Sequence, residues 1–115
     1  KCIITPDAYG VVKLDTTWTV VPEKAFYGCF DIAEVEIPAK ITEILDKAFS
    51  RSWNLREVTF EVGSRLEIIG DKAFYETALE KVTIPVKVTK LSSKAFSYIL
   101  PLEEVIFESG TQLET

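Results

Sequence analysis

Apolar residues return along this chain at a nearly constant interval. The tripeptide Lys-Ala-Phe occurs at 24–26, 47–49, 72–74 and 94–96, so that its phenylalanines are 23, 25 and 22 residues apart. The apolar residues five positions before each phenylalanine are Val21, Ile44, Ile69 and Leu91. Several positions that recur together indicate one structural unit stacked many times. The sequence therefore predicts a single repeat array over residues 1–115, with about four full units and partial units at both ends.

Each unit also contains a short segment in which apolar and polar residues alternate. The apolar members are the pairs Val12/Leu14, Val35/Ile37, Val58/Phe60, Val82/Ile84 and Val105/Phe107. Alternation of this kind, rich in β-branched residues, is typical of a strand with one buried face. Pro38 and Pro85 directly follow two of these segments, and a proline cannot donate a ladder hydrogen bond. One strand per unit predicts a parallel β-ladder.

The Lys-Ala-Phe segments carry helix-forming residues, but they are too short to be stable as free helices. We expect one or two turns of α- or 3₁₀-helix in each unit, with Asp46 and Asp71 as N-terminal caps. Residues 61–65 form a turn two residues longer than its counterpart in the preceding unit, which accounts for the 25-residue step.

The final segment, 104–108, is expected to be an open edge. In the sequence given, Phe107 and Leu113 have no following repeat to cover them. Because exposed strand edges pair with other chains, we expect end-to-end self-association through this unit.

Composition and charge indicate which classes of partner molecule the protein can bind. Hydrophobic residues make up 47% of the chain, enough to bury a core, and 18 acidic residues against 13 basic ones give a net charge of −5. Such a balance argues against nucleic acid or an anionic membrane as the main partner. The sequence contains no apolar run near the ~20 residues that a membrane span needs. It also lacks an initiator methionine and a signal segment, so we expect a mature or excised piece of a longer protein.

The residue types present exclude most catalytic chemistry. The chain has no histidine, which removes Ser-His and Cys-His nucleophiles and leaves no credible zinc site. The remaining enzymatic hypothesis is a carboxylate pair such as Glu34 and Glu57. An acid and a base need different environments, whereas an open sheet offers both groups the same water. We therefore expect no catalysis, no metal and no cofactor.

Cys2 and Cys29 allow two interpretations. They are either two buried free thiols or one disulfide, which closes a loop of roughly 27 residues and adds about 3 kcal/mol of stability.

The order of these elements resembles the BspA-type leucine-rich repeats of bacterial and protist surface proteins. The residues that carry the resemblance are Leu55-x-x-Val58-x-Phe60, Ile69-Gly70-x-x-Ala73-Phe74, Ile32-x-x-Val35-x-Ile37-Pro38 and Ala25-Phe26-x-x-Cys29. The resemblance implies a right-handed α/β solenoid, with a short parallel sheet on the concave face and short helical turns on the convex side. It also implies a secreted or surface-anchored protein that adheres to macromolecules of a host or neighbouring cell, and it implies no catalytic residue.

The outward-pointing strand residues form two columns whose rungs are about 4.8 Å apart. The first column is Val11, Glu34, Glu57, Lys81 and Glu104, and the second is Lys13, Glu36, Thr59, Thr83 and Ile106. One hypothesis is an acidic surface that binds a basic segment of a partner protein, alone or with a cation. The alternative is a solvated face in which Glu57, Lys81 and Glu104 neutralise one another.

Four residues break the repeat pattern two positions before Ile32, Leu55, Leu79 and Leu102. They are Phe30, Trp53, Thr77 and Leu100. The preferred interpretation is that the large apolar members fold inward and thicken the core. The alternative is an exposed apolar stripe, which marks a contact site with Trp53 as its anchor.

The sequence therefore predicts a non-catalytic protein-binding or adhesion module of a cell-surface or secreted protein. The alternative is a passive spacer whose repeats bind no ligand.

Overall fold

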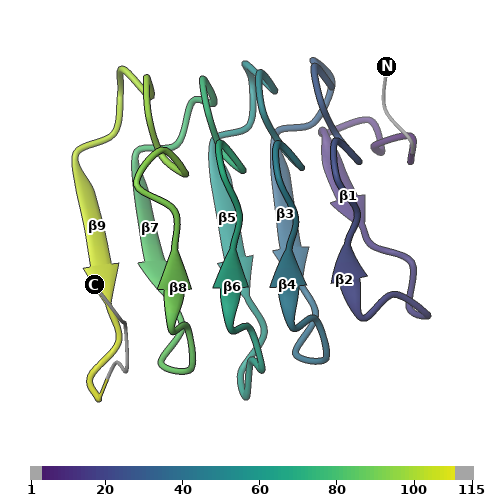
Figure 1. Cartoon of the computed structure of the whole chain (residues 1–115). Coiled ribbons are helices and arrows are strands. Elements are labelled where there is room, and N and C mark those ends of the chain that lie inside the picture. Colours follow the sequence, from purple (N-terminus) through teal and green to yellow (C-terminus); the bar gives the residue numbers. More distant parts are fainter. Residues whose placement is uncertain (1–3, 111–115) are drawn as a thin grey trace.

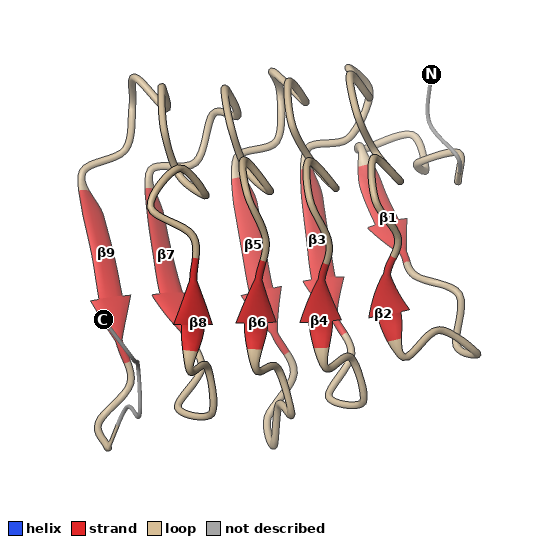
Figure 2. Cartoon of the chain, in the orientation of Figure 1, coloured by secondary structure: helices blue, strands red, loops and turns tan. Residues whose placement is uncertain are grey.

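The chain is a parallel β-solenoid of about four coils. The computed structural model describes residues 4–110, in which nine short strands alternate between two ladders that face each other (Figure 1). The first ladder contains β1 (Val11–Lys13), β3 (Glu34–Ile37), β5 (Glu57–Phe60), β7 (Lys81–Ile84) and β9 (Glu104–Phe107). The second contains β2 (Val20–Val21), β4 (Glu43–Ile44), β6 (Ile68–Ile69) and β8 (Lys90–Leu91). Each coil runs along one ladder, turns, and returns along the other (Figure 2).

The first ladder has the predicted register. Val12 lies opposite Val35, Val35 opposite Val58, and Val82 opposite Val105. The apolar member of each rung points inward, because Val12, Val35, Val58 and Val82 are at most 5% exposed. The predicted parallel ladder is confirmed from β1 to β5 and from β7 to β9, but β5 and β7 are not hydrogen-bonded neighbours, so the expected ladder is not continuous.

The second ladder was not predicted from the sequence. Each of its strands has only two residues, which is too short for alternation to be visible. Its inward residues are Val21, Ile44 and Ile69, which were recognised only as apolar positions of the repeat, and they are at most 1% exposed. Pairing continues without a break from β2 through β4 and β6 to β8.

The phenylalanines of the repeated tripeptide stack along the middle of the solenoid. Neighbouring ring centroids are 5.0 Å apart for Phe26 and Phe49, 5.2 Å for Phe49 and Phe74, and 5.2 Å for Phe74 and Phe96, with ring planes within 6° of parallel. The first three rings are fully buried, and Phe96 is partly buried against the core. Each ring therefore packs on the ring of the next coil.

The expected helical turns are absent from the described part of the chain. In the first two Lys-Ala-Phe segments, the backbone N–H groups of the lysine and the phenylalanine donate to the next coil instead of to a carbonyl four residues back, and in the third segment that of Phe74 does so. Phe49 N donates to Ala73 O at 2.7 Å and Lys47 N to Asp71 O at 2.9 Å. Asp46 does not cap a helix, since its Oδ1 accepts a hydrogen bond from Asp71 N of the next coil at 2.8 Å.

Left-handed backbone conformations explain why these segments do not become helices. Lys24, Lys47 and Lys72 have φ angles of 58°, 61° and 56°. An L-residue in this region interrupts a right-handed helix and costs roughly 1–2 kcal/mol. The conformation turns successive N–H groups in different directions, so that alternate ones reach the neighbouring coil.

The connections between strands differ in length from coil to coil. The upper turns, which join each strand of the second ladder to the next strand of the first, contain 12 residues at 22–33, 45–56 and 92–103 but 11 at 70–80. The lower turns join the first ladder to the second, and the one at 61–67 is two residues longer than those at 38–42 and 85–89. The predicted insertion at 61–65 is therefore confirmed.

The C-terminal coil is less covered than the others. Phe107 is 40% exposed, whereas Ile37 and Ile84 at the same strand position are fully buried. Leu113 lies outside the described residues, and end-to-end association stays a prediction.

Cys29 is fully buried and is not a free thiol, so the free-thiol interpretation is wrong at this position. Cys2 lies outside the described residues. Within residues 4–110, no helix has the length and hydropathy needed to cross a membrane.

We predict that Phe49→Ala destabilises the protein by about 3–5 kcal/mol, because the missing ring leaves a cavity between two stacked phenylalanines. Chemical denaturation measures the loss. Phe30→Ala is the matched control, since it removes the same ring at a position that is 50% exposed and should cost less than about 1.5 kcal/mol. Equal losses for the two variants would contradict the stack as the main source of cohesion.

We predict that Lys47→Gly stabilises the protein by about 0.5–1 kcal/mol, because glycine adopts the left-handed conformation without steric cost. Lys94 holds the same place in the last tripeptide but is not among the residues with positive φ. Lys94→Gly should therefore give no gain and lose about 0.5–1 kcal/mol. Thermal unfolding of both variants tests this difference, and a destabilised Lys47→Gly would contradict it.

Candidate functional site

The polar face of the first ladder brings together the two predicted columns of outward residues. Glu34 lies opposite Glu57 and Glu36 opposite Thr59. On the last two rungs, Lys81 lies opposite Glu104 and Thr83 opposite Ile106. Most of these side chains are exposed, Glu34 is half-buried, and Ile106 is 39% exposed. The columns therefore have the composition that the repeat register predicted.

The columns are interrupted between β5 and β7. These strands are not hydrogen-bonded neighbours, although β6 and β8 of the same coils are paired. The break coincides with the third upper turn, which has one residue fewer than the other three. A shallow groove of about 720 Å³ lies over the break, lined by residues that include Arg56, Glu57, Thr59, Lys81, Thr83 and Ile106.

Negative charge is concentrated in the segments that form and flank the first ladder. The carboxylates on the strands of the first ladder or within two residues of them are Asp15, Glu34, Glu36, Glu57, Glu61, Glu80, Glu103, Glu104 and Glu108. The cations of the same segments are Lys13, Arg56 and Lys81. The surplus of six carboxylates exceeds the net charge of −5 of the whole chain, so the rest of the molecule is close to neutral.

Mutual neutralisation of these groups by ion pairing is not observed. Between residues 4 and 110, the one ion pair joins Arg51 Nε to Glu76 Oε1 at 3.0 Å, and it lies in the upper turns. Glu57 and Lys81 belong to strands that are not paired with each other. Most carboxylates of the first ladder therefore face solvent, with no basic side chain of the described residues within ion-pair distance.

Two of the acidic residues have a structural role, because they accept hydrogen bonds from the preceding coil. Glu61 Oε1 accepts a hydrogen bond from Ala39 N at 2.7 Å, and Glu108 Oε1 accepts one from Val86 N at 2.8 Å. In both cases the glutamate follows a strand and reaches the residue after the proline of the preceding coil. These two carboxylates tie neighbouring coils together.

Asp15 forms hydrogen bonds within its own turn. Its Oδ1 accepts hydrogen bonds from the hydroxyl of Thr17 at 2.6 Å and from the backbone N of Thr17 at 2.8 Å. The side-chain bond, followed by the backbone bond, lowers the pKa of Asp15 below its ordinary value of 3.8. Any stability gained in this way is present above the pKa of the unfolded chain and is lost as the pH falls through the folded pKa.

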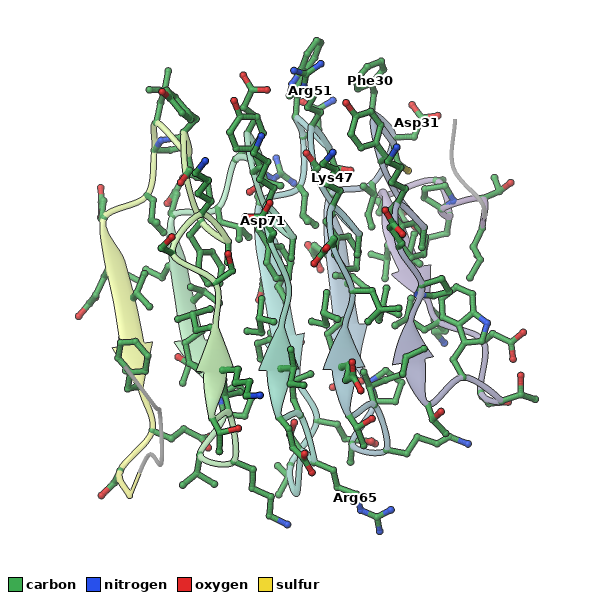
Figure 3. All side chains as sticks on the ribbon, in the orientation of Figure 1. Phe30, Asp31, Lys47, Arg51, Arg65 and Asp71 are labelled. Carbon is green, nitrogen blue, oxygen red and sulfur yellow. The ribbon has the colours of Figure 1, made fainter. Side chains whose placement is uncertain are left out.

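A second surface lies at the edge of the solenoid formed by the upper turns. Phe30 and Trp53 are 50% and 57% exposed there, and their rings stack with centroids 4.7 Å apart and planes at 22°. Figure 3 shows Phe30 and Arg51 at this edge, with Arg65 at the opposite one. The preferred interpretation of inward-folded side chains is therefore wrong, and the aromatic pair is exposed.

The four pattern-breaking residues do not all share this edge. Leu100 is 94% exposed, but Thr77 is buried at 5%, and its hydroxyl donates to Phe74 O at 3.0 Å. The third upper turn has one residue fewer than the others. The residue two positions before Leu79 is therefore Thr77, whose side chain points inward. Counting forward from the phenylalanine aligns Thr77 with the buried Ser52 and places Ala78, which has only a methyl group, where the second coil has Trp53.

Among residues 4–110, no group of three or more His, Cys, Asp or Glu side chains is arranged to hold a metal ion.

The repeat is that of a known family. A profile described as "BspA type Leucine rich repeat region" matches residues 11–114 with six copies. The chain belongs to the BspA-type leucine-rich repeat family. No curated protein matches it at a significant level.

Solved structures of bacterial leucine-rich repeat proteins share the fold of this BspA-type array. The pneumococcal vaccine antigen PcpA matches with a TM-score of 0.84 and 25% identity over 96% of this chain and 32% of PcpA, so the array spans about a third of that protein. A leucine-rich repeat protein of Bacteroides capillosus matches with a TM-score of 0.75 and 25% identity over 89% of this chain and 79% of its own. A leucine-rich cell surface protein of Faecalibacterium prausnitzii matches with a TM-score of 0.60 and 20% identity over 89% of this chain and 36% of its own.

We predict that NMR titration of Asp15 gives a pKa below 3.8, because ionisation strengthens both hydrogen bonds from Thr17. Thr17→Val keeps the shape of the side chain and removes its hydroxyl donor. The pKa of Asp15 should then rise toward 3.8, with the backbone donor retained. An unchanged value in the variant would show that the hydroxyl has no part in the shift.

Proposed function

We propose that this array is a non-catalytic protein-binding module of a cell-surface or secreted protein, and that its first ladder binds a basic segment of a partner. The observation that carries the proposal is the concentration of negative charge in and beside the strands of the first ladder, which leaves the rest of the molecule nearly neutral. A charged face steers a partner of opposite sign and selects against others.

The position of the charges supports this function. Glu36, Glu57 and Glu104 are exposed strand residues, and within residues 4–110 none of them has an ion-pair partner. The strands beneath them are fixed by the core, so the carboxylates hold fixed places on the face, and paired strands such as β3 and β5 lie about 4.8 Å apart. A bound lysine or arginine would relieve repulsion between neighbouring carboxylates such as Glu34 and Glu57.

The groove between β5 and β7 gives this face an apolar element beside its charges. Ile106 and Phe60 lie next to Glu57 and Thr59 in its lining. A partner segment that carries both basic and apolar residues would therefore find matching groups in one place.

The cell-surface setting rests on the relatives. PcpA is a vaccine antigen, and the Faecalibacterium prausnitzii protein is described as a cell surface protein. The spacer function predicts a uniformly polar exterior, and the exposed pair Phe30 and Trp53 argues against it.

The test removes the same amount of charge from two faces. Glu36→Gln with Glu57→Gln alters the first ladder, and Glu43→Gln with Glu67→Gln alters the second. The probe is a short peptide of alternating lysine and leucine, titrated by isothermal calorimetry at low salt. We predict that the first pair weakens binding about fivefold, because two partly exposed charges contribute about 1 kcal/mol together, and that the second pair leaves it within twofold.

Equal losses from both pairs would mean that the peptide responds only to net charge. No measurable binding to the unaltered protein would favour the spacer.

A further inference from the structure

The exposed residues of the upper turns form a row that is interrupted in one coil. The turn-edge row consists of Phe30 in the first full coil, Trp53 in the second and Leu100 in the fourth. The third coil has only the methyl group of Ala78 at this point, and its Leu79 follows Phe74 after five residues, whereas Leu55 follows Phe49 after six. A place in the row is therefore unfilled between Trp53 and Leu100.

The unfilled place borders the second ring face of Trp53. Phe30 stacks on one face of this indole with a centroid distance of 4.7 Å, close to the rung spacing of about 4.8 Å. On the other side the third coil passes directly toward the core, and Ala78 N donates to Leu55 O at 2.9 Å. Trp53 is accordingly 57% exposed, and Leu100 two coils beyond is 94% exposed.

The spacing of the row suits one planar ring. Two rungs separate Trp53 from Leu100, and a ring placed midway lies about 4.8 Å from each rung. That distance is within the range of stacked aromatic pairs. An aromatic ring of another molecule would stack on Trp53 in the same way that Trp53 stacks on Phe30.

We propose that Trp53 and Leu100 receive an aromatic side chain of a partner protein, which fills the stacking place that the third coil leaves open. This contact goes beyond the proposed function, because it lies on the turn edge and uses none of the carboxylates of the first ladder.

The charges and polar groups around the row favour a neutral aromatic ring over a sugar or a charged group. Arg51 and Glu76, in the upper turns of the second and third coils, neutralise each other in an ion pair at 3.0 Å. The amide of Asn54 donates to Phe30 O at 2.7 Å. These polar groups are already paired within the protein. The site therefore offers the apolar surface of Trp53, Ala78 and Leu100 and few free donors or acceptors for the hydroxyl groups of a sugar.

The experiment follows the indole N–H signals of the protein by NMR while a small probe is added. The probe is N-acetyl-tryptophanamide, with N-acetyl-alaninamide and N-acetylglucosamine as comparison ligands. We expect a saturable shift of the Trp53 signal with the aromatic probe alone. Trp18, whose ring is half-buried against Phe26, should not move and serves as the internal control. Trp53→Ala should abolish the saturable shifts of neighbouring backbone signals such as Ala78 and Leu100.

A second variant tests the unfilled place itself. Insertion of one phenylalanine between Thr77 and Ala78 restores the six-residue step and supplies the missing ring, so it should weaken probe binding at least tenfold. Insertion of one serine at the same point restores the length without a ring, and this matched control should keep binding within threefold.

The proposal is overturned if the aromatic probe gives no saturable shift, if the phenylalanine insertion leaves binding unchanged, or if the sugar binds in place of the aromatic probe. None of these results would alter the outcome of the charge-matched test on the first ladder, so the two proposals fail separately.

Discussion

Contact between identical positions of neighbouring coils holds this molecule together. A single coil has strands of two to four residues and no helix in the described chain, so it cannot bury its own apolar side chains. Stacking changes this, because Phe49 is covered by Phe26 on one side and Phe74 on the other, and alternate N–H groups find acceptors in the next coil. Such an array is stabilised by nearest-neighbour interfaces, and each coil depends on the two beside it.

The number of residues in each turn decides where this regularity is broken. The third upper turn is one residue shorter than the others, while its phenylalanine and its buried Leu79 keep their places in the core. The shorter turn therefore has fewer exposed residues than the others. The missing pairing between β5 and β7, with a groove above it, lies beside this turn, and so does the interruption of the row that contains Trp53. Both surfaces on which the functional proposals rest therefore include the place where the repeat is irregular.

The two surfaces differ in chemistry because they meet different constraints. Outward strand residues of the first ladder touch only their rung neighbours and solvent, so carboxylates are tolerated there at a repulsion of about 1 kcal/mol per pair in water. The upper turns carry left-handed residues such as Arg51 and Glu76, whose side chains project outward and pair with each other. Aromatic residues at the next exposed place stack across coils without entering the core.

The sequence alone determined the repeat, the register within β1–β5 and within β7–β9, and the identity of the buried phenylalanines. These features depend on the spacing of apolar residues, which the fold must respect in order to bury them. Tertiary structure decided the rest. The tripeptides form turns because alternate N–H groups bond to the next coil, an option that local helix propensity does not reveal. Phe30 and Trp53 are exposed because the buried residue beside them, Cys29 or Ser52, already fills the interior, and this became clear only once the coils were stacked.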